Sequence, residues 1–121
     1  LNLGESHEKT LEIAETIAEI DLQLGEYEDC LLNFQELCDV YREKFGDKHE
    51  KIGDFLLKLG FINYKIGNYT DAKDNLKEAD QIFRAILKET GRKEADEETK
   101  TKLKNKIQKI QKDLMRMQDL F

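Results

Sequence analysis

Apolar side chains return every three or four residues along most of this chain, which is the spacing of one face of an α-helix. These stripes predict helices over residues 8–24, 27–45, 50–66 and 69–90. Proline, which would interrupt a helix, is absent. The sequence therefore predicts an all-α fold. The clearest stripe steps by 4, 3, 4, 3 and 4 residues through Tyr27, Leu31, Phe34, Cys38, Tyr41 and Phe45.

Two stretches of the chain match each other at an offset of 42 residues. His7-Glu8-Lys9 returns as His49-Glu50-Lys51, and Gly25-Glu26-Tyr27 returns as Gly67-Asn68-Tyr69. A fixed period of this length is typical of proteins built from stacked supersecondary units. Each glycine stands where a first helix must end, and glycine tolerates the left-handed conformation of a helix C-terminus. Each unit is therefore predicted to be an αα-hairpin.

The match divides the chain into segments. Residues 1–7 are interpreted as the tail of a preceding repeat, because Leu3-Gly4-Glu5-Ser6-His7 aligns with Phe45-Gly46-Asp47-Lys48-His49. Residues 8–48 are the first hairpin and residues 49–91 the second. Residues 92–121 are a polar connector and an amphipathic helix, with Asp96, Glu97 and Glu98 suited to its first turn. We therefore expect a fragment of a longer protein.

The last helix carries an apolar stripe at heptad spacing, for which two interpretations are open. As a capping helix, it would cover the exposed face of the second hairpin. As the start of a coiled coil, it would pair with another chain, and the stripe would be a homo- or hetero-oligomer interface. The stripe consists of Leu103, Ile107, Ile110, Leu114, Met117 and Phe121.

Within each unit, the order of residue types resembles the tetratricopeptide repeat over residues 3–90. A small residue on the first helix is followed by glycine-x-tyrosine at the turn, then by a small, a large and another core residue on the second helix. In the first unit these are Ala18, Gly25, Tyr27, Cys30, Phe34 and Leu37; in the second they are Gly60, Gly67, Tyr69, Ala72, Leu76 and Ala79.

The long period and the connector over residues 45–52 are similar to those of kinesin light chains and related scaffold proteins. Glu50 stands where that connector usually carries proline, and Asp21 and Asn63 replace an aromatic residue common on the first helix. The resemblance implies an α-solenoid of antiparallel helix hairpins that acts as a non-enzymatic protein–protein interaction scaffold. It further implies a cytoplasmic location, in a motor, centriolar or ciliary assembly.

By this resemblance, the first helix of each hairpin lines a concave groove that binds a partner. The groove would be acidic at one end and apolar with aromatics at the other, which suits a peptide or helix with basic residues and apolar anchors. Alternatively, two repeats make too little groove, and these residues face water or an upstream repeat. The partner-binding positions would be Glu12, Glu15, Glu19, Leu22, Gln23, Asp54, Leu57, Phe61, Tyr64 and Lys65.

Charge is distributed unevenly within a net charge of −6. Residues 1–50 carry 14 acidic and 4 basic side chains, whereas the chain from Thr99 onward is net +5. The basic run is ordinarily a solvated helix face, with an acidic partner, a membrane surface or RNA as alternatives. Because no aromatic residues alternate with the lysines, we expect no nucleic-acid partner. The second function left open is a structural oligomerisation end piece that acts through the last helix.

The sequence offers no reaction centre. Cys30 and Cys38 lie eight positions apart on one expected helix, too far to bridge each other, and are interpreted as buried, reduced side chains. His7 and His49 belong to separate repeats, where a role at the start of a helix is expected. No phosphate loop or nucleophile motif is present. We expect no catalytic residue, cofactor, metal site or membrane span.

Overall fold

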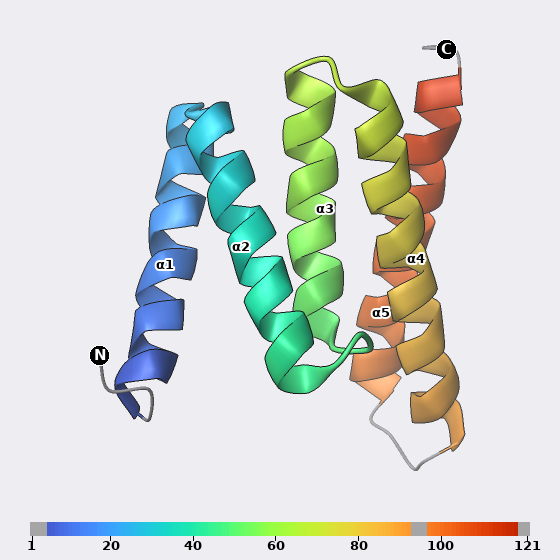
Figure 1. Ribbon diagram of the computed structural model, residues 1–121. Coiled ribbons are helices and arrows are strands. Elements are labelled where there is room, and N and C mark those ends of the chain that lie inside the picture. The colour runs from blue at the N-terminus through green and yellow to red at the C-terminus, as the bar shows by residue number, and fades with distance from the viewer. Residues whose placement is uncertain (1–4, 93–96, 119–121) are drawn as a thin grey trace.

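Five α-helices make up the computed structural model, which describes residues 5–92 and 97–118 (Figure 1). The expected all-α fold is confirmed. The first helix begins at Glu5, earlier than expected, and residues 1–4 of the expected preceding tail lie outside the described residues. The helices are α1 (Glu5–Leu24), α2 (Tyr27–Phe45), α3 (Glu50–Lys65), α4 (Tyr69–Arg92) and α5 (Glu97–Met117).

The two glycine turns have the same geometry. Gly25 and Gly67 have φ values of 77° and 88°, which confirms the predicted left-handed conformation. After each glycine, a backbone N–H closes the turn: that of Glu26 donates to the carbonyl of Asp21 at 2.9 Å, and that of Asn68 to the carbonyl of Asn63 at 2.8 Å. The 42-residue match therefore reports the same helix-ending turn in both hairpins.

Small residues bring the helices of the second hairpin close together. A Cβ atom on Gly60 would lie 3.0 Å from Cδ2 of Leu76, and one on Gly53 would lie 2.5 Å from Cε1 of Phe83. Ala72, on the facing side of α4, is completely buried. The expectation that a small residue at position 60 permits a close approach is confirmed; Gly53 was not expected to act in this way.

Aromatic side chains join the two hairpins. The ring of Phe55 on α3 lies 6.1 Å from that of Phe34 and 5.2 Å from that of Tyr41, both on α2. His49 starts α3: its Nδ1 accepts a 3.1 Å hydrogen bond from the N–H of Lys51, as expected for a residue at a helix start. The side chain of His7 lies outside the described residues.

The last helix, α5, packs against α4 and lies beside it in Figure 1. Most of its apolar stripe belongs to the same core as the hairpins, with Leu114 partly buried. The buried side chains of this stripe therefore pack inside the protein while α5 stays on α4. Phe121 lies outside the described residues. The buried members of the stripe are Leu103, Ile107, Ile110 and Met117.

Two further expectations concern the cysteines and the membrane. Cys30 and Cys38 are free thiols in the core, and burial raises the pKa of both, which keeps them protonated and unreactive. Among the described residues, no helix combines the length and the apolar character that crossing a bilayer requires.

Candidate partner-binding groove

Ion pairs join α1, α3 and α5 in a row. The ammonium of Lys51 on α3 lies 2.5 Å from Glu15 on α1, and that of Lys58 lies 3.6 Å from Glu19. On the other side of α3, Lys106 of α5 lies 2.7 Å from Glu50 and 2.8 Å from Asp54. The first helix of each hairpin and the last helix therefore share one surface, which contains two adjoining hollows.

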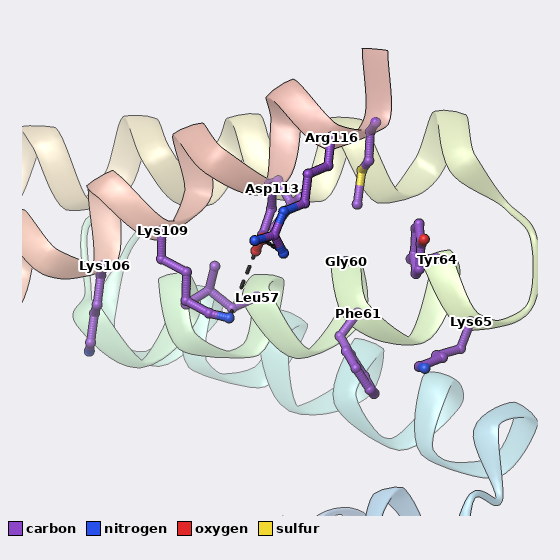
Figure 2. Close-up of a pocket in the computed structure, with 11 residues that line it drawn as sticks. Leu57, Gly60, Phe61, Tyr64, Lys65, Lys106, Lys109, Asp113 and Arg116 are labelled. Carbon is purple, nitrogen blue, oxygen red and sulfur yellow. Dashed lines mark ion pairs between the residues drawn. The ribbon is translucent and has the colours of Figure 1, made fainter. Parts of the chain in front are cut away.

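The hollow between α3 and α5 has an apolar floor and a cationic rim (Figure 2). Its volume is about 360 Å³. Phe61 and Tyr64 of α3 lie at its side and remain 46% and 41% exposed, so their rings are accessible to a ligand. The other residues that line it are Leu57, Gly60, Lys65, Leu76, Lys106, Lys109, Asp113, Arg116 and Met117.

The rim of this hollow carries more positive than negative charge. Lys109 and Arg116 each lie 3.9 Å from Asp113, so that one carboxylate is shared between two cations. Figure 2 shows these three side chains of α5 over Leu57 of α3. Lys65 lies at the same hollow, with its ammonium 5.4 Å from the centre of the Phe61 ring. This edge is suited to a negatively charged group.

The hollow between α1 and α3 is larger, at about 680 Å³, and its charges are balanced within the chain. Its carboxylates at Glu15, Glu19 and Asp54 pair with lysines of α3 and α5. Burial lowers the pKa of Lys51, but the hydrogen bond and the attraction to Glu15 outweigh this, and the net pKa is raised. These side chains are charged, yet each already has a partner.

The sequence predicted a groove that is acidic at one end and apolar with aromatics at the other; in the structure, two carboxylates of the acidic end are paired within the chain. Glu15 and Glu19 of α1 pair with Lys51 and Lys58 of the next hairpin, which offsets their negative charge. The cations Lys109 and Arg116 come from α5, which was expected to be a capping helix or the start of a coiled coil and not a wall of the groove. The run of lysines on the last helix was the only signal, and it did not show which of them would face α3.

The structure brings most of the expected partner-binding positions to the two hollows. Two of them, Glu12 and Gln23, are exposed on α1 and line neither. The positions that do line a hollow are Glu15, Glu19, Leu22, Asp54, Leu57, Phe61, Tyr64 and Lys65.

Across residues 5–92 and 97–118, no three His, Cys, Asp or Glu side chains gather in a way that would hold a metal ion. The hollows instead combine accessible aromatic rings, an apolar floor and fixed cations, which are the groups that recognise peptide side chains.

Stacked αα-hairpins whose first helices form a common surface define a helical-repeat module of the α-solenoid class. A family model described as "Tetratricopeptide repeat" matches residues 3–85, more than half of the chain. The chain therefore belongs to the tetratricopeptide repeat family, which typically forms non-enzymatic modules for protein–protein interaction. Searches of curated proteins and of solved structures found no match.

Proposed function

We propose that this chain binds a peptide of a partner protein in the groove along α1, α3 and α5. The hollow between α3 and α5 is the observation that carries this proposal. Phe61 and Tyr64 line this hollow beside an apolar floor, and both are exposed large side chains. Exposed aromatic rings next to a concave apolar surface are typical of the sites that dominate binding energy in interfaces.

The charges at this hollow favour an acidic peptide. Lys65, Lys109 and Arg116 line the hollow with one carboxylate, that of Asp113, which lies 3.9 Å from both Lys109 and Arg116. An aromatic or large aliphatic side chain of the peptide would enter the hollow, and Asp or Glu beside it would meet these cations. The basic peptide expected from the sequence has less support, because Glu15 and Glu19, the α1 carboxylates that line a hollow, are already paired with lysines.

The scaffold in which this module works is proposed to be a cytoplasmic motor, centriolar or ciliary assembly. This part of the proposal is supported by the similarity of the 42-residue repeats to those of kinesin light chains.

Two fluorescent peptides of equal length test the proposal by anisotropy. Both carry one central aromatic residue, flanked in one peptide by Asp and Glu and in the other by Lys and Arg. The acidic peptide should bind more tightly. The double substitution Phe61→Ala and Tyr64→Ala should weaken its binding by about tenfold or more, because truncating an aromatic anchor typically costs over 1 kcal/mol.

The charge-reversal variant Lys109→Glu/Arg116→Glu should lose the acidic peptide. Its matched control is Lys104→Glu/Lys112→Glu, which changes the net charge equally at two exposed positions of α5 that line neither hollow. The control should keep most of the affinity. Equal losses in both variants would mean that the peptide responds only to the overall charge of α5, and the site would be rejected.

A further inference from the structure

The hollow between α3 and α5 changes in character along its length (Figure 2). Toward one end, charged side chains of α5 lie over Leu57 of α3, namely those of Lys109, Asp113 and Arg116. Tyr64 lies two turns farther along α3, which is about 10 Å from Leu57 at 1.5 Å per residue. A ligand that lies along the hollow therefore meets cations at one end and an aromatic ring at the other.

The apolar end has room for a single ring. Leu76 and Met117, which are 4% and 6% exposed, line the hollow together with Tyr64. Gly60 also lines it and has no side chain that would fill the space. The volume of about 360 Å³ is near the lower limit of ligand pockets, which is about 300 Å³. The hollow is therefore suited to one side chain of a partner and not to a longer segment.

The cations at the other end are accessible to an anion. The side chains of Lys109 and Arg116 are 76% and 79% exposed, and each lies 3.9 Å from Asp113. That separation is too long for a hydrogen bond, so Asp113 offsets their charge without occupying their N–H groups. Lys106 also lines the hollow, but it already donates to two carboxylates of α3 and offers less to a ligand.

We propose that this hollow is a phosphotyrosine site, in which one side chain of the partner peptide supplies both the ring and the anion. This inference rests on the peptide-binding function proposed for the groove. The ring would lie against Leu76 and Met117, beside Tyr64. The phosphate would reach Lys109 and Arg116, because an arginine side chain can bind phosphate through two parallel hydrogen bonds. Phosphorylation of the partner would then control its docking.

The charge of the hollow matches a phosphate better than a carboxylate. Apart from Lys106, its charged lining consists of three cations and one carboxylate, a net charge of +2: Lys65, Lys109, Arg116 and Asp113. A phosphate monoester carries a charge of about −1.5 to −2 at neutral pH and three acceptor oxygens, whereas Asp or Glu carries one negative charge. Phosphoserine supplies the same charge, but it has no ring to fill the apolar end.

Three fluorescent peptides of one sequence test this proposal by anisotropy with the full chain. Their central residue is tyrosine, phosphotyrosine or phosphoserine, and their flanking residues are uncharged. The phosphotyrosine peptide should bind about tenfold more tightly or more than the tyrosine peptide, since hydrogen bonds between ions are roughly twice as strong as neutral ones. It should also bind more tightly than the phosphoserine peptide. Equal affinities of the tyrosine and phosphotyrosine peptides, or of the two phosphopeptides, would overturn the proposal.

Arg116→Gln should remove most of the gain from phosphorylation and leave the affinity of the tyrosine peptide unchanged. Lys112→Gln is the matched control, because Lys112 is exposed on the same helix and lines neither hollow. Circular dichroism should show the same helix content in both variants, since the side chain of Arg116 is 79% exposed. Equal losses in the two variants would mean a general attraction to α5 and would reject the site.

The peptide flanked by Asp and Glu distinguishes a failure of this inference from a failure of the proposed function. If that peptide binds through Phe61 and Tyr64 while phosphorylation of tyrosine adds no affinity, the phosphotyrosine site is rejected and the peptide-binding groove stands. If Phe61→Ala/Tyr64→Ala leaves the binding of every peptide unchanged, the groove itself is rejected.

Discussion

The side-chain amide of Asn63 on α3 donates a 2.7 Å hydrogen bond to the side-chain oxygen of Asn75 on α4. In the first hairpin, the amide of Asn33 on α2 donates to the carboxylate of Asp21 on α1 at 3.5 Å. The two pairs occupy equivalent positions at the 42-residue offset. Each hairpin is therefore joined by a polar contact at the positions where Asp21 and Asn63 replace the aromatic residue that is common in this family.

Asn63→Ala should lower the free energy of unfolding by about 1–3 kcal/mol, because it removes a buried hydrogen bond and leaves Asn75 without its partner. Asn63 is 6% exposed, whereas Asn33 is half-buried and its hydrogen bond is longer. Asn33→Ala should therefore cost less. Urea denaturation followed by circular dichroism measures both; an equal or larger loss for Asn33→Ala would contradict this account.

Gly53→Ala should destabilise the protein although alanine favours a helix. The added Cβ would lie 2.5 Å from Cε1 and 2.7 Å from Cζ of the fully buried ring of Phe83. Overpacking of this kind costs about 1–3 kcal/mol, which exceeds the gain of about 1 kcal/mol from replacing glycine in a helix. Thermal and urea denaturation should show the net loss.

Two comparisons isolate the steric cause. Gly60→Ala should cost less, since its Cβ would meet the end of the Leu76 side chain at 3.0 Å. Combining Gly53→Ala with Phe83→Leu should cost less than the sum of the two changes, because the smaller side chain leaves room for the methyl group. If the loss of stability in the double variant equals the sum of the two single losses, Gly53→Ala acts through the backbone and not through its contact with Phe83.

The Lys106 bridge should make stability depend on alkaline pH. Burial lowers the pKa of Lys106, but hydrogen bonds to Asp54 and Glu50 outweigh it, so the folded chain holds this proton more tightly than the unfolded chain. The bridge therefore contributes fully below the ordinary lysine pKa of about 10.4. Its contribution falls as the pH rises through that value toward the higher pKa of the folded state.

Urea denaturation between neutral and strongly alkaline pH would measure this loss. Lys106→Met, which keeps much of the apolar stem, should be less stable at neutral pH and should show a smaller decrease on alkalinisation. Lys104→Met is the control, since Lys104 lies on the same helix as Lys106 but is exposed. Identical pH profiles for the original chain and Lys106→Met would exclude the bridge as a source of alkaline sensitivity.

Ile110→Ala should lower the free energy of unfolding by about 2–5 kcal/mol, because it opens a cavity between α5 and α4. Ile110 is 1% exposed, whereas Met115 on the same helix is 67% exposed. Met115→Ala should change stability by about 0.5 kcal/mol or less. Sedimentation should show the same mass before and after Ile110→Ala. If the stripe instead joined two chains, the substitution would dissociate a dimer.

Helix positions could be predicted well from the sequence, and contacts between helices less well. The stripe from Tyr27 to Phe45 gave the bounds of α2, and the glycine-x-tyrosine match gave both turns. The close approach at Gly53 could not be found in this way, because its equivalent in the first hairpin is Leu11. The repeat predicts only those features that both copies share.

By itself, the sequence determined the helices, the two hairpins and their order, since helical periodicity and glycine conformation act over a few neighbouring residues. Tertiary structure alone decided which charges of the groove are paired, and with which carboxylates. Lys106 meets Asp54, and Lys109 reaches the hollow beside Phe61, across more than forty intervening residues. Such pairings depend on how α5 packs along α3 and α4. A pattern of neighbouring residues does not specify contacts between helices that are far apart in the sequence.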